Sequence, residues 1–185
     1  MGQLIVVEGI DCSGKSTLVS KLADHFNCYS SGFPDRSTSI GQLINQVLQK
    51  KETISDKKAL HLLFTANRFE LQNTLKNMLL TQDIILDRYI YSGIAYSVAQ
   101  GLDLEWCMTK EEGLLKADKV IYLDIDASVS ASRKGFGDEL YEKQQFLEKV
   151  VESFKTLIEE KWCIINANQS KDQVFEEACR FINSK

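Results

Sequence analysis

The stretch LIVVEGIDCSGKST, residues 4–17, combines a buried strand with a phosphate-binding loop. Residues 4–7 form a continuous apolar run, which is typical of a strand that is covered on both faces. Residues 9–17 match the pattern G-x-x-x-x-G-K-[ST], and an apolar helical pattern begins at Leu18. In this context the loop's backbone N–H groups surround phosphate oxygens. The stretch therefore predicts an α/β domain built around a P-loop.

The rest of the chain alternates between apolar runs and helical patterns. Residues 84–86, 120–123 and 163–165 are short runs like the first, and residues 28–33 form a weaker fifth candidate. Apolar residues recur at helical spacing in residues 40–48, 60–79, 146–158 and 174–182. Such alternation favours a parallel sheet covered by helices and joined by right-handed crossovers. We expect residues 1–185 to form one three-layer α/β domain with about five strands.

The composition argues against a surface that binds nucleic acid or an anionic membrane, and an acidic protein can still bind phosphate in a positive cleft. The 185 residues carry a formal net charge of −4, whereas surfaces that bind nucleic acid or anionic lipid are usually basic. No apolar run approaches the roughly 18 residues of a membrane span. The five scattered cysteines indicate free thiols in a reducing compartment. Because a strand begins at once, we expect no targeting peptide and a cytoplasmic protein, with nuclear presence left open.

The glycine-rich loop supplies the groups that a bound triphosphate requires. We expect Lys15 to reach the β- and γ-phosphates and the Ser16 hydroxyl to bind Mg²⁺. Asp87 ends the second buried strand beside this loop, where Mg²⁺ or its water ligands are held, although it could instead, or also, cap the next helix. The loop residues that we expect to contact ATP are Gly9, Asp11, Cys12, Ser13, Gly14, Lys15, Ser16 and Thr17.

Arginine is scarce, and its positions point to a second anion site. Only five of the 22 basic residues are arginine. Arg36 follows a proline turn, Arg68 lies on the apolar face of a helix where it needs a partner, and Arg88 lies at the sheet edge. Arg133 opens a basic, glycine-containing stretch, about residues 133–142, that is typical of a mobile lid. Any one of these arginines could be a structural ion pair, but four around one phosphate loop favour a substrate with its own phosphate.

A second phosphate-bearing substrate predicts the reaction. A phosphomonoester has a second pKa of about 6, so it is mostly a dianion at pH 7 and needs no general base. Catalysis then consists of positioning and of charge neutralisation by Lys15, Mg²⁺ and a lid arginine, while lid closure excludes water. We therefore predict a nucleoside monophosphate kinase whose catalytic residues are Lys15, Asp87, Arg88 and Arg133.

Five motifs together resemble the thymidylate kinase family, most closely its eukaryotic and viral branch. They are the P-loop, FPDRST at 33–38, LLFTANRFE at 62–70, DRY at 87–89 with SG at 92–93, and FG at 136–137 with YE at 141–142. As a set they are specific, although the P-loop alone is not. The resemblance implies the P-loop nucleoside monophosphate kinase fold and phosphorylation of dTMP by ATP to give dTDP, for dTTP synthesis.

The resemblance also implies a role for each residue of the acceptor site. Phe64 would stack on thymine, Arg68 would donate to its carbonyl edge, and Arg36 with Arg88 would bind the phosphate. Asp11 would hold the 3′-hydroxyl, and Tyr96 would lie under the sugar. Without the resemblance, Asp11 would be interpreted as a residue that stabilises a turn, and Phe64 and Tyr96 as core residues. The dTMP-binding set that the resemblance implies is Asp11, Phe33, Arg36, Phe64, Asn67, Arg68, Arg88, Gly93, Tyr96 and Tyr141.

Three features outside the acceptor site follow from the same resemblance. Arg133 would lie near the adenine or the transferring phosphate of ATP. Members of the family usually form homodimers through helices. A cis peptide bond would precede Pro34.

Two positions depart from the eukaryotic pattern. Cys12 stands where that branch usually carries an arginine, and Leu140 stands where relatives often carry one. Either Arg133 and Lys134 supply the missing charge from the lid, or turnover is slower. Because Cys12 precedes a helix and lies near Lys15, we also expect a lowered pKa for its thiol.

Three other functions fit parts of the sequence. A deoxynucleoside kinase would need a carboxylate base just beyond the first strand, where Glu8 lies. A GTP-dependent switch protein would carry an N-K-x-D element, for which Asn166-Ala167-Asn168 is a poor substitute. Cys12 leaves open a nucleotide-binding partner without catalytic activity.

Overall fold

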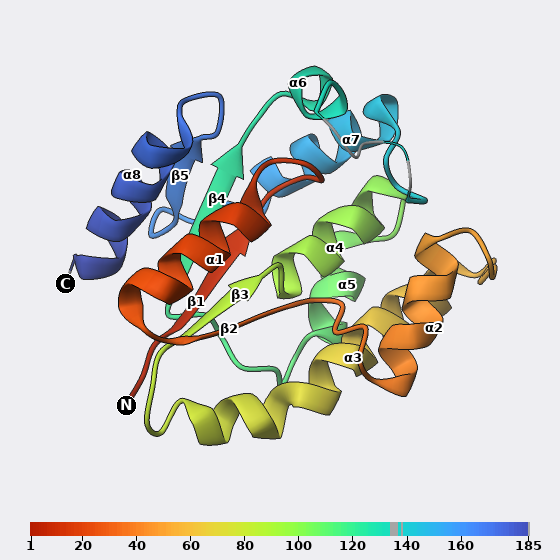
Figure 1. The fold of residues 1–185 in the computed structure, drawn as a ribbon. Helices are drawn as coiled ribbons and strands as arrows, with labels where there is room; N and C mark the ends of the chain where they lie inside the picture. The colour runs from red at the N-terminus through yellow and green to blue at the C-terminus, as the bar shows by residue number, and fades with distance from the viewer. Residues whose placement is uncertain (134–136, 138, 185) are drawn as a thin grey trace.

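A parallel sheet forms the centre of the molecule (Figure 1). The structure is a computed structural model and describes residues 1–133, 137 and 139–184. The strands are β1 Leu4–Glu8, β2 Tyr29–Gly32, β3 Ile84–Asp87, β4 Lys119–Asp124 and β5 Cys163–Asn166. They form a 5-stranded sheet in the order β2-β3-β1-β4-β5, and every neighbouring pair is parallel. The predicted three-layer α/β fold is confirmed.

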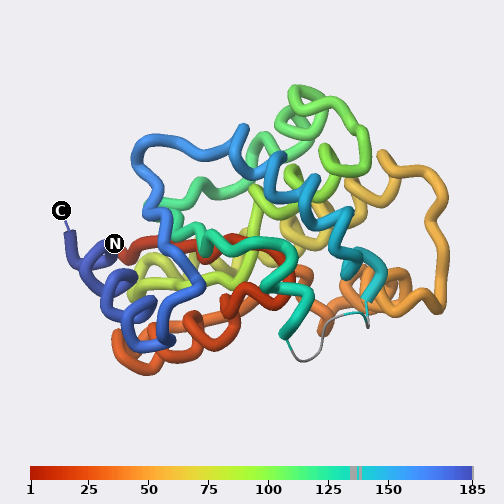
Figure 2. Tube along the Cα trace, turned by 90° about the horizontal axis from the view of Figure 1, so that it is seen from above, coloured from red at the N-terminus to blue at the C-terminus, as the bar shows by residue number. Residues whose placement is uncertain are grey.

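Helices cover both faces of this sheet. They are α1 Lys15–Phe26, α2 Ser39–Leu48, α3 Lys57–Met78, α4 Ile90–Ala99, α5 Leu104–Lys110, α6 Ala127–Ala131, α7 Gln144–Lys155 and α8 Lys171–Asn183. Helices α1 and α8 pack together on one face, whereas α4 and α7 pack together on the other, as Figure 2 shows from above. Helix α2 packs against α3, at the right-hand side of Figure 1.

The alternation of side chains along β1 explains the two layers. Ile5 and Val7 belong to a core cluster with Leu22 of α1, whereas Leu4 and Val6 belong to a second cluster with Leu75 of α3. Successive side chains of a strand point to opposite faces, so a strand between two helical layers must be apolar at every position. The continuous apolar run at the start of the chain is the direct consequence.

Several element boundaries differ from the sequence-based expectation. Helix α1 begins at Lys15, because Gly14 adopts φ 104 and ends the loop there. Helix α3 begins three residues earlier than predicted, at Lys57, where the Asp56 carboxylate accepts from the Ala59 N–H at 2.8 Å. The weaker fifth strand is confirmed as β2 at the sheet edge. Helices α5 and α6, of 7 and 5 residues, are too short to show a period in the sequence.

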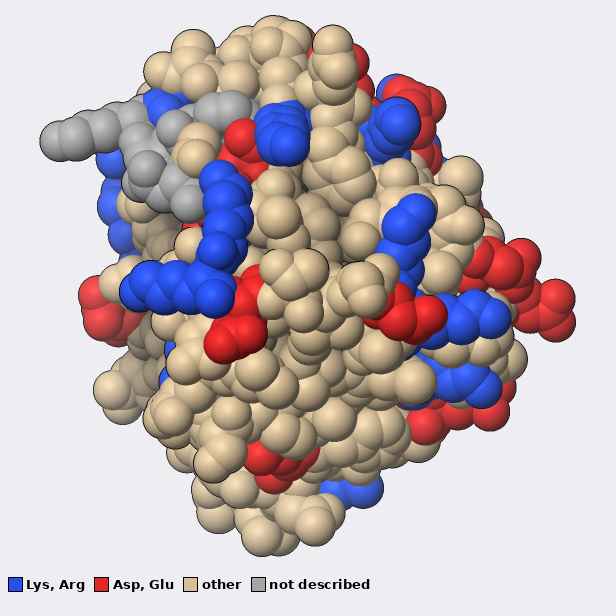
Figure 3. Space-filling view, turned by 90° about the vertical axis from the view of Figure 1, so that its right-hand side faces the viewer, with Lys and Arg blue, Asp and Glu red and all other residues tan. Residues whose placement is uncertain are grey.

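The fold gathers the predicted site residues at one edge of the sheet. The P-loop follows β1, Phe33 follows β2, and Asp87 ends β3, so all three lie at the carboxyl ends of parallel strands. The expected cis peptide bond joins Phe33 to Pro34. On the face that Figure 3 shows, basic and acidic side chains lie next to one another. Within the described ranges, no helix combines the length and hydropathy needed to cross a membrane.

Candidate active site

The P-loop curls around the side chain of Lys15. Gly9 has φ 147, and a Cβ there would lie 2.9 Å from the Leu123 carbonyl oxygen, so the turn requires glycine. The buried Lys15 ammonium donates to the Ile10 carbonyl at 2.6 Å and to Ser13 Oγ at 3.3 Å. Burial, and next the Arg88 charge, lowers the pKa of Lys15 to about 8. A bound polyphosphate would supply the negative charge that this lysine lacks.

Two oxygen groups meet next to Lys15. The Ser16 hydroxyl donates to Asp87 Oδ2 at 2.5 Å. The other oxygen, Asp87 Oδ1, is buried and has no hydrogen-bond partner in the part of the chain that the structure describes. A hydroxyl and a carboxylate with a spare buried oxygen are donors that suit Mg²⁺, so the residues fit the predicted ion.

Glu8, not Asp87, caps the helix after β3. The fully buried Glu8 carboxylate accepts from the backbone N–H groups of Tyr89 at 3.0 Å and Ser92 at 3.2 Å, and also from the Ser92 hydroxyl. Burial raises the pKa of Glu8 although these hydrogen bonds and Arg88 oppose it. Because Glu8 is committed to the start of α4 and does not line the cavity, it cannot act as the base that a nucleoside kinase would need.

Arg88 and Asp11 form the central ion pair of the site. Arg88 has φ 66, and its guanidinium donates to Asp11 Oδ1 at 2.5 Å, to the Gly9 carbonyl at 2.8 Å and to Ser92 Oγ at 3.0 Å. The Tyr96 hydroxyl donates to Asp11 Oδ2 at 2.7 Å. Burial opposes ionisation of Asp11, but Arg88 and Lys15 outweigh it and hold its pKa below the ordinary value. Asp11 is therefore held from two sides, by Arg88 and by Tyr96, which the sequence did not predict.

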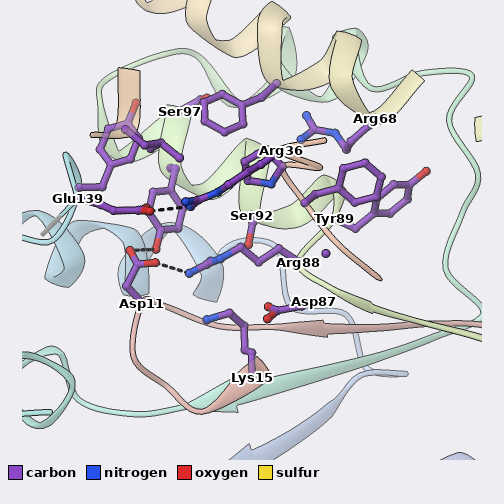
Figure 4. A pocket seen from close by; sticks show the side chains of 18 of the residues that line it. Asp11, Lys15, Arg36, Arg68, Asp87, Arg88, Tyr89, Ser92, Ser97 and Glu139 are labelled. Atoms are coloured by element: carbon purple, nitrogen blue, oxygen red, sulfur yellow. Dashed lines mark hydrogen bonds and ion pairs between the residues drawn. The ribbon is translucent and has the colours of Figure 1, made fainter. Parts of the chain in front are cut away.

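A cavity of about 350 Å³ lies over these groups. The predicted acceptor residues on its wall are Asp11, Phe33, Arg36, Phe64, Arg68, Arg88, Gly93, Tyr96 and Tyr141. Lys15, Ser16 and Asp87 line the same cavity. Figure 4 shows the nitrogen ends of Lys15, Arg36 and Arg88 on one side of it, toward Asp11 and Glu139. The fold therefore brings the predicted phosphate and acceptor residues together.

Arg68 lies away from Lys15 on the cavity wall (Figure 4) and is buried, with 2% of its surface exposed. Its Nε donates to Glu111 Oε2 at 2.9 Å, and its Nη2 donates to Glu111 Oε1. Phe64 lies one turn earlier on the same helix and lines the cavity beside it. The two residues that the resemblance assigns to the base therefore lie together on the cavity wall.

Asn67 is the one predicted acceptor residue that does not line the cavity. It is fully buried, and its Oδ1 accepts from the Asp35 N–H at 2.8 Å. Its Nδ2 donates to the Asp35 carbonyl at 3.1 Å and to Thr38 Oγ1 at 3.0 Å. The side chain therefore holds the turn that carries Phe33 and Arg36.

The described end of the predicted lid closes over Arg36. Arg36 Nη2 lies 2.6 Å from Glu139 Oε1, and Nη1 donates to Asn45 Oδ1 at 2.8 Å. The Tyr141 hydroxyl accepts from Gln100 Nε2 at 3.3 Å, and its ring lies 5.6 Å from that of Tyr96. The lid residues Lys134, Gly135 and Phe136 lie outside the described residues.

Arg133 lies on the other side of the P-loop. It donates to the Cys12 carbonyl and to the Ala167 carbonyl, both at 2.9 Å. A second cavity of about 700 Å³ lies there, and its wall includes Cys12, Ser13, Gly14, Lys15, Ser16, Thr17 and Arg133. Cys12, Lys15 and Ser16 line both cavities.

The expected low pKa of the Cys12 thiol is wrong. Burial, followed by the charges of Glu142 and Asp11, raises this pKa. Helix α1 begins only at Lys15, so Cys12 lies outside the first helical turn, where the effect of the helix dipole is concentrated. Nothing in the sequence indicates that the acidic lid residue Glu142 lies near Cys12, because the two residues are far apart along the chain.

Comparison with known proteins decides the family. The thymidylate kinase family model matches residues 7–178. The chain belongs to the thymidylate kinase family. Enzymes of this family phosphorylate dTMP to dTDP with ATP, so the predicted family and reaction are confirmed, and the deoxynucleoside kinase, GTP switch and binding-partner alternatives are not needed.

Eukaryotic thymidylate kinases resemble the chain over nearly its whole length. It is 46% identical over 179 residues to the enzyme of Arabidopsis thaliana, covering 94% of this chain and 68% of the relative. It is 41% identical over 192 residues to that of Dictyostelium discoideum, covering 100% and 86%. The solved thymidylate kinase of Candida albicans superposes with a TM-score of 0.92 at 39% identity, covering 98% of this chain and 91% of the other.

Sequence reasoning missed three residues that shape this thymidylate kinase site. Glu111 pairs with Arg68, Glu139 pairs with Arg36, and Ser92 connects Arg88 to Glu8. The signal for Glu111 was indirect: an arginine on an apolar helix face must have a partner, but the sequence does not say which carboxylate.

Proposed function

We propose that the two cavities position dTMP against ATP through Lys15, Asp87, Arg88 and Arg133, with Mg²⁺ as cofactor. The observation that carries this proposal is the single space shared by the Lys15 ammonium, the Ser16–Asp87 oxygens and the Arg88–Asp11 pair. Phosphoryl transfer needs little covalent chemistry from a protein and depends on placing opposite charges around the moving group. This arrangement supplies those charges.

On this proposal Ser16 and Asp87 hold Mg²⁺. When bound, the ion neutralises charge on the triphosphate. Lys15 would bind the β- and γ-phosphates from the P-loop side, and the backbone N–H groups of Ser13 and Gly14 would complete the cradle.

The acceptor lies between Arg88 and the base-binding end. Arg36 and Arg88 bind its phosphate, whose second pKa of about 6 leaves it mostly dianionic, so no base is needed. Asp11, held by Arg88 and Tyr96, accepts from the 3′-hydroxyl. Phe64 stacks on thymine and Arg68 donates to its carbonyl edge. Phe33, Gly93 and Tyr141 shape the walls, and Asn67 acts by holding the turn.

Arg133 replaces the positive charge that Cys12 cannot provide. Its guanidinium already contacts the Cys12 carbonyl at 2.9 Å, at the junction of the two cavities. A short movement of this lid residue would bring it to the transferring phosphate, where an arginine is worth about 10³–10⁵ in rate in related phosphoryl transfer.

The chain also carries features that support a homodimer in the cytoplasm. Leu62 and Phe69 lie seven residues apart on one face of α3 and are 44% and 40% exposed. Such an apolar face on a long helix suits packing against a second copy. Sedimentation of the Leu62→Glu variant tests the dimer, because this variant should sediment as a monomer if this face is the interface.

The free thiols support a cytoplasmic protein. All five cysteines are free, which fits a reducing compartment.

The test of the catalytic proposal compares Arg133→Met with Arg180→Met. Arg180 is exposed on α8 and serves as the matched control. We expect Arg133→Met to lower kcat by about 10²–10³ with KM for dTMP nearly unchanged, because its charge acts on the transition state. The control should keep the kcat of the unmodified enzyme. Equal kcat in all three proteins would remove Arg133 from the mechanism.

A further inference from the structure

The buried partner of Arg68 controls how this arginine faces the cavity. Arg68 rises from α3, and Glu111 follows α5, 43 residues later in the chain. Both side chains are almost fully buried, at 2% and 3% exposure. The carboxylate takes two parallel hydrogen bonds, from Nε and from Nη2, which is the fork geometry that fixes a guanidinium in plane.

Neighbouring groups restrain rotation of the Arg68 guanidinium and of the Glu111 carboxylate. Thr65 Oγ1 donates to Glu111 Oε1 at 2.8 Å, so the carboxylate is itself held from the helix that carries Arg68. On the other side Gly93 lies so near that a Cβ would be 2.6 Å from Nη2 and 2.9 Å from Nη1 of Arg68. The buried His61 lies next to the pair, with its Nε2 at 3.5 Å from Glu111 Oε1. Burial lowers the pKa of His61, which disfavours an imidazolium charge that would compete with Arg68 for the carboxylate.

This arrangement leaves one corner of the guanidinium for a ligand. Nε and Nη2 are occupied by Glu111, whereas Nη1 has no hydrogen-bond partner among the residues that the structure describes. Arg68 is one of the cavity-lining residues, and it is placed at the end where Phe64 lies. Arginine has only donors, so this corner offers N–H groups and no acceptor.

We propose that Glu111 is a positioning residue that sets the base preference of the enzyme by holding Arg68 with its Nη1 corner toward the base. The inference rests on the proposed base contact of Arg68. A pyrimidine with a carbonyl oxygen at that place accepts from Nη1. A pyrimidine with an amino group there presents N–H to N–H and leaves both donors buried and unpaired, which costs far more than a lost contact. Without Glu111 the guanidinium could turn and lose this discrimination.

The test measures kcat and KM for dTMP, dCMP and ATP in Glu111→Gln. Glutamine keeps the shape but loses the charge and one acceptor. We expect KM for dTMP to rise about 10–100-fold, kcat to stay within about threefold, and the dTMP to dCMP ratio of kcat/KM to fall at least about tenfold. The KM for ATP should not change. The adjacent Glu112, which is exposed, gives the matched control Glu112→Gln.

Two further variants keep the outcomes distinct. Arg68→Met should lose the same discrimination, and adding Glu111→Gln to it should change little more, because the two residues act as one unit. If Arg68→Met leaves KM and base preference unchanged, the base contact in the proposed function fails. If Arg68→Met loses the preference while Glu111→Gln keeps it, or if Glu111→Gln impairs ATP and dTMP equally, the positioning role is overturned.

A milder variant covers the case in which Glu111→Gln does not fold. Thr65→Val removes the hydroxyl that donates to Glu111 Oε1 at 2.8 Å and accepts from Arg68 Nη2 at 3.3 Å, so it loosens the ion pair without removing either charge. We expect KM for dTMP to rise about 3–10-fold with a parallel loss of preference over dCMP. A Thr65→Val enzyme with the unmodified KM and preference would contradict the proposal.

Discussion

Raising the pH should weaken ATP binding through Lys15. Burial, and next Arg88, lowers the pKa of this lysine to about 8 in the free protein. Only the protonated form can bind the triphosphate, and a bound anion raises the pKa again, so binding above pH 8 must take up a proton. The last ionisation of the triphosphate has a pKa of about 6, which lies below this range, so it adds no pH dependence to ATP binding above pH 7.

The size of the effect follows from the fraction of charged lysine. With a pKa of about 8, roughly nine tenths of Lys15 is protonated at pH 7 and one tenth at pH 9. The apparent Kd for a non-hydrolysable ATP analogue with Mg²⁺ should therefore rise about tenfold from pH 7 to pH 9.

Calorimetry in two buffers with different ionisation enthalpies measures both quantities. At pH 9 we expect uptake of about 0.9 proton for each analogue bound. Lys15→Arg provides the control, because a guanidinium stays charged over this range and its Kd should be flat with pH. A flat Kd for the unmodified enzyme between pH 7 and pH 9, with no proton uptake, would refute the assignment of Lys15.

Two further predictions concern the acceptor side. Gly93→Ala places a Cβ 2.6 Å from Arg68 Nη2, which the ion pair with Glu111 prevents from moving. An overpacking cost of about 1–3 kcal/mol should raise KM for dTMP about 5–150-fold and leave KM for ATP the same, whereas an unchanged KM for dTMP in steady-state kinetics would contradict this prediction. Glu139 occupies Arg36 at 2.6 Å in the free enzyme, so Glu139→Gln should lower KM for dTMP about 2–5-fold, the range expected for a partly exposed pair, and an increased KM would show that Glu139 helps rather than competes.

Local patterns in the sequence predicted the elements and residues that depend on near neighbours. The P-loop, the apolar runs of the central strands and the acidic residue at the end of β3 are set by contiguous residues, and the structure has them in place. Strand β2, YSSG, gave a weak signal because an edge strand is paired on one side and half exposed. Asp87 was also a candidate helix cap, and the structure gives that task to Glu8.

Pairings between distant segments could not be predicted. Glu111 meets Arg68 from 43 residues away, and Glu139 meets Arg36 from 103 residues away. No periodicity relates such positions, so one carboxylate looks like any other until the fold is known. The wrong expectation for Cys12 has the same origin: the loop sequence shows Lys15 nearby, but not the lid carboxylate of Glu142 or the true start of α1.

The choice of acceptor is tested by measuring ADP release with ATP, Mg²⁺ and six acceptors side by side. The acceptors are dTMP, dUMP, dCMP, AMP, GMP and thymidine. A cavity with Arg88 and Arg36 for a phosphate and the Arg68 corner for a carbonyl predicts the highest kcat/KM with dTMP, strong rejection of dCMP, and negligible turnover of thymidine. Turnover of thymidine as fast as dTMP, or of dCMP as fast as dTMP, would contradict the account.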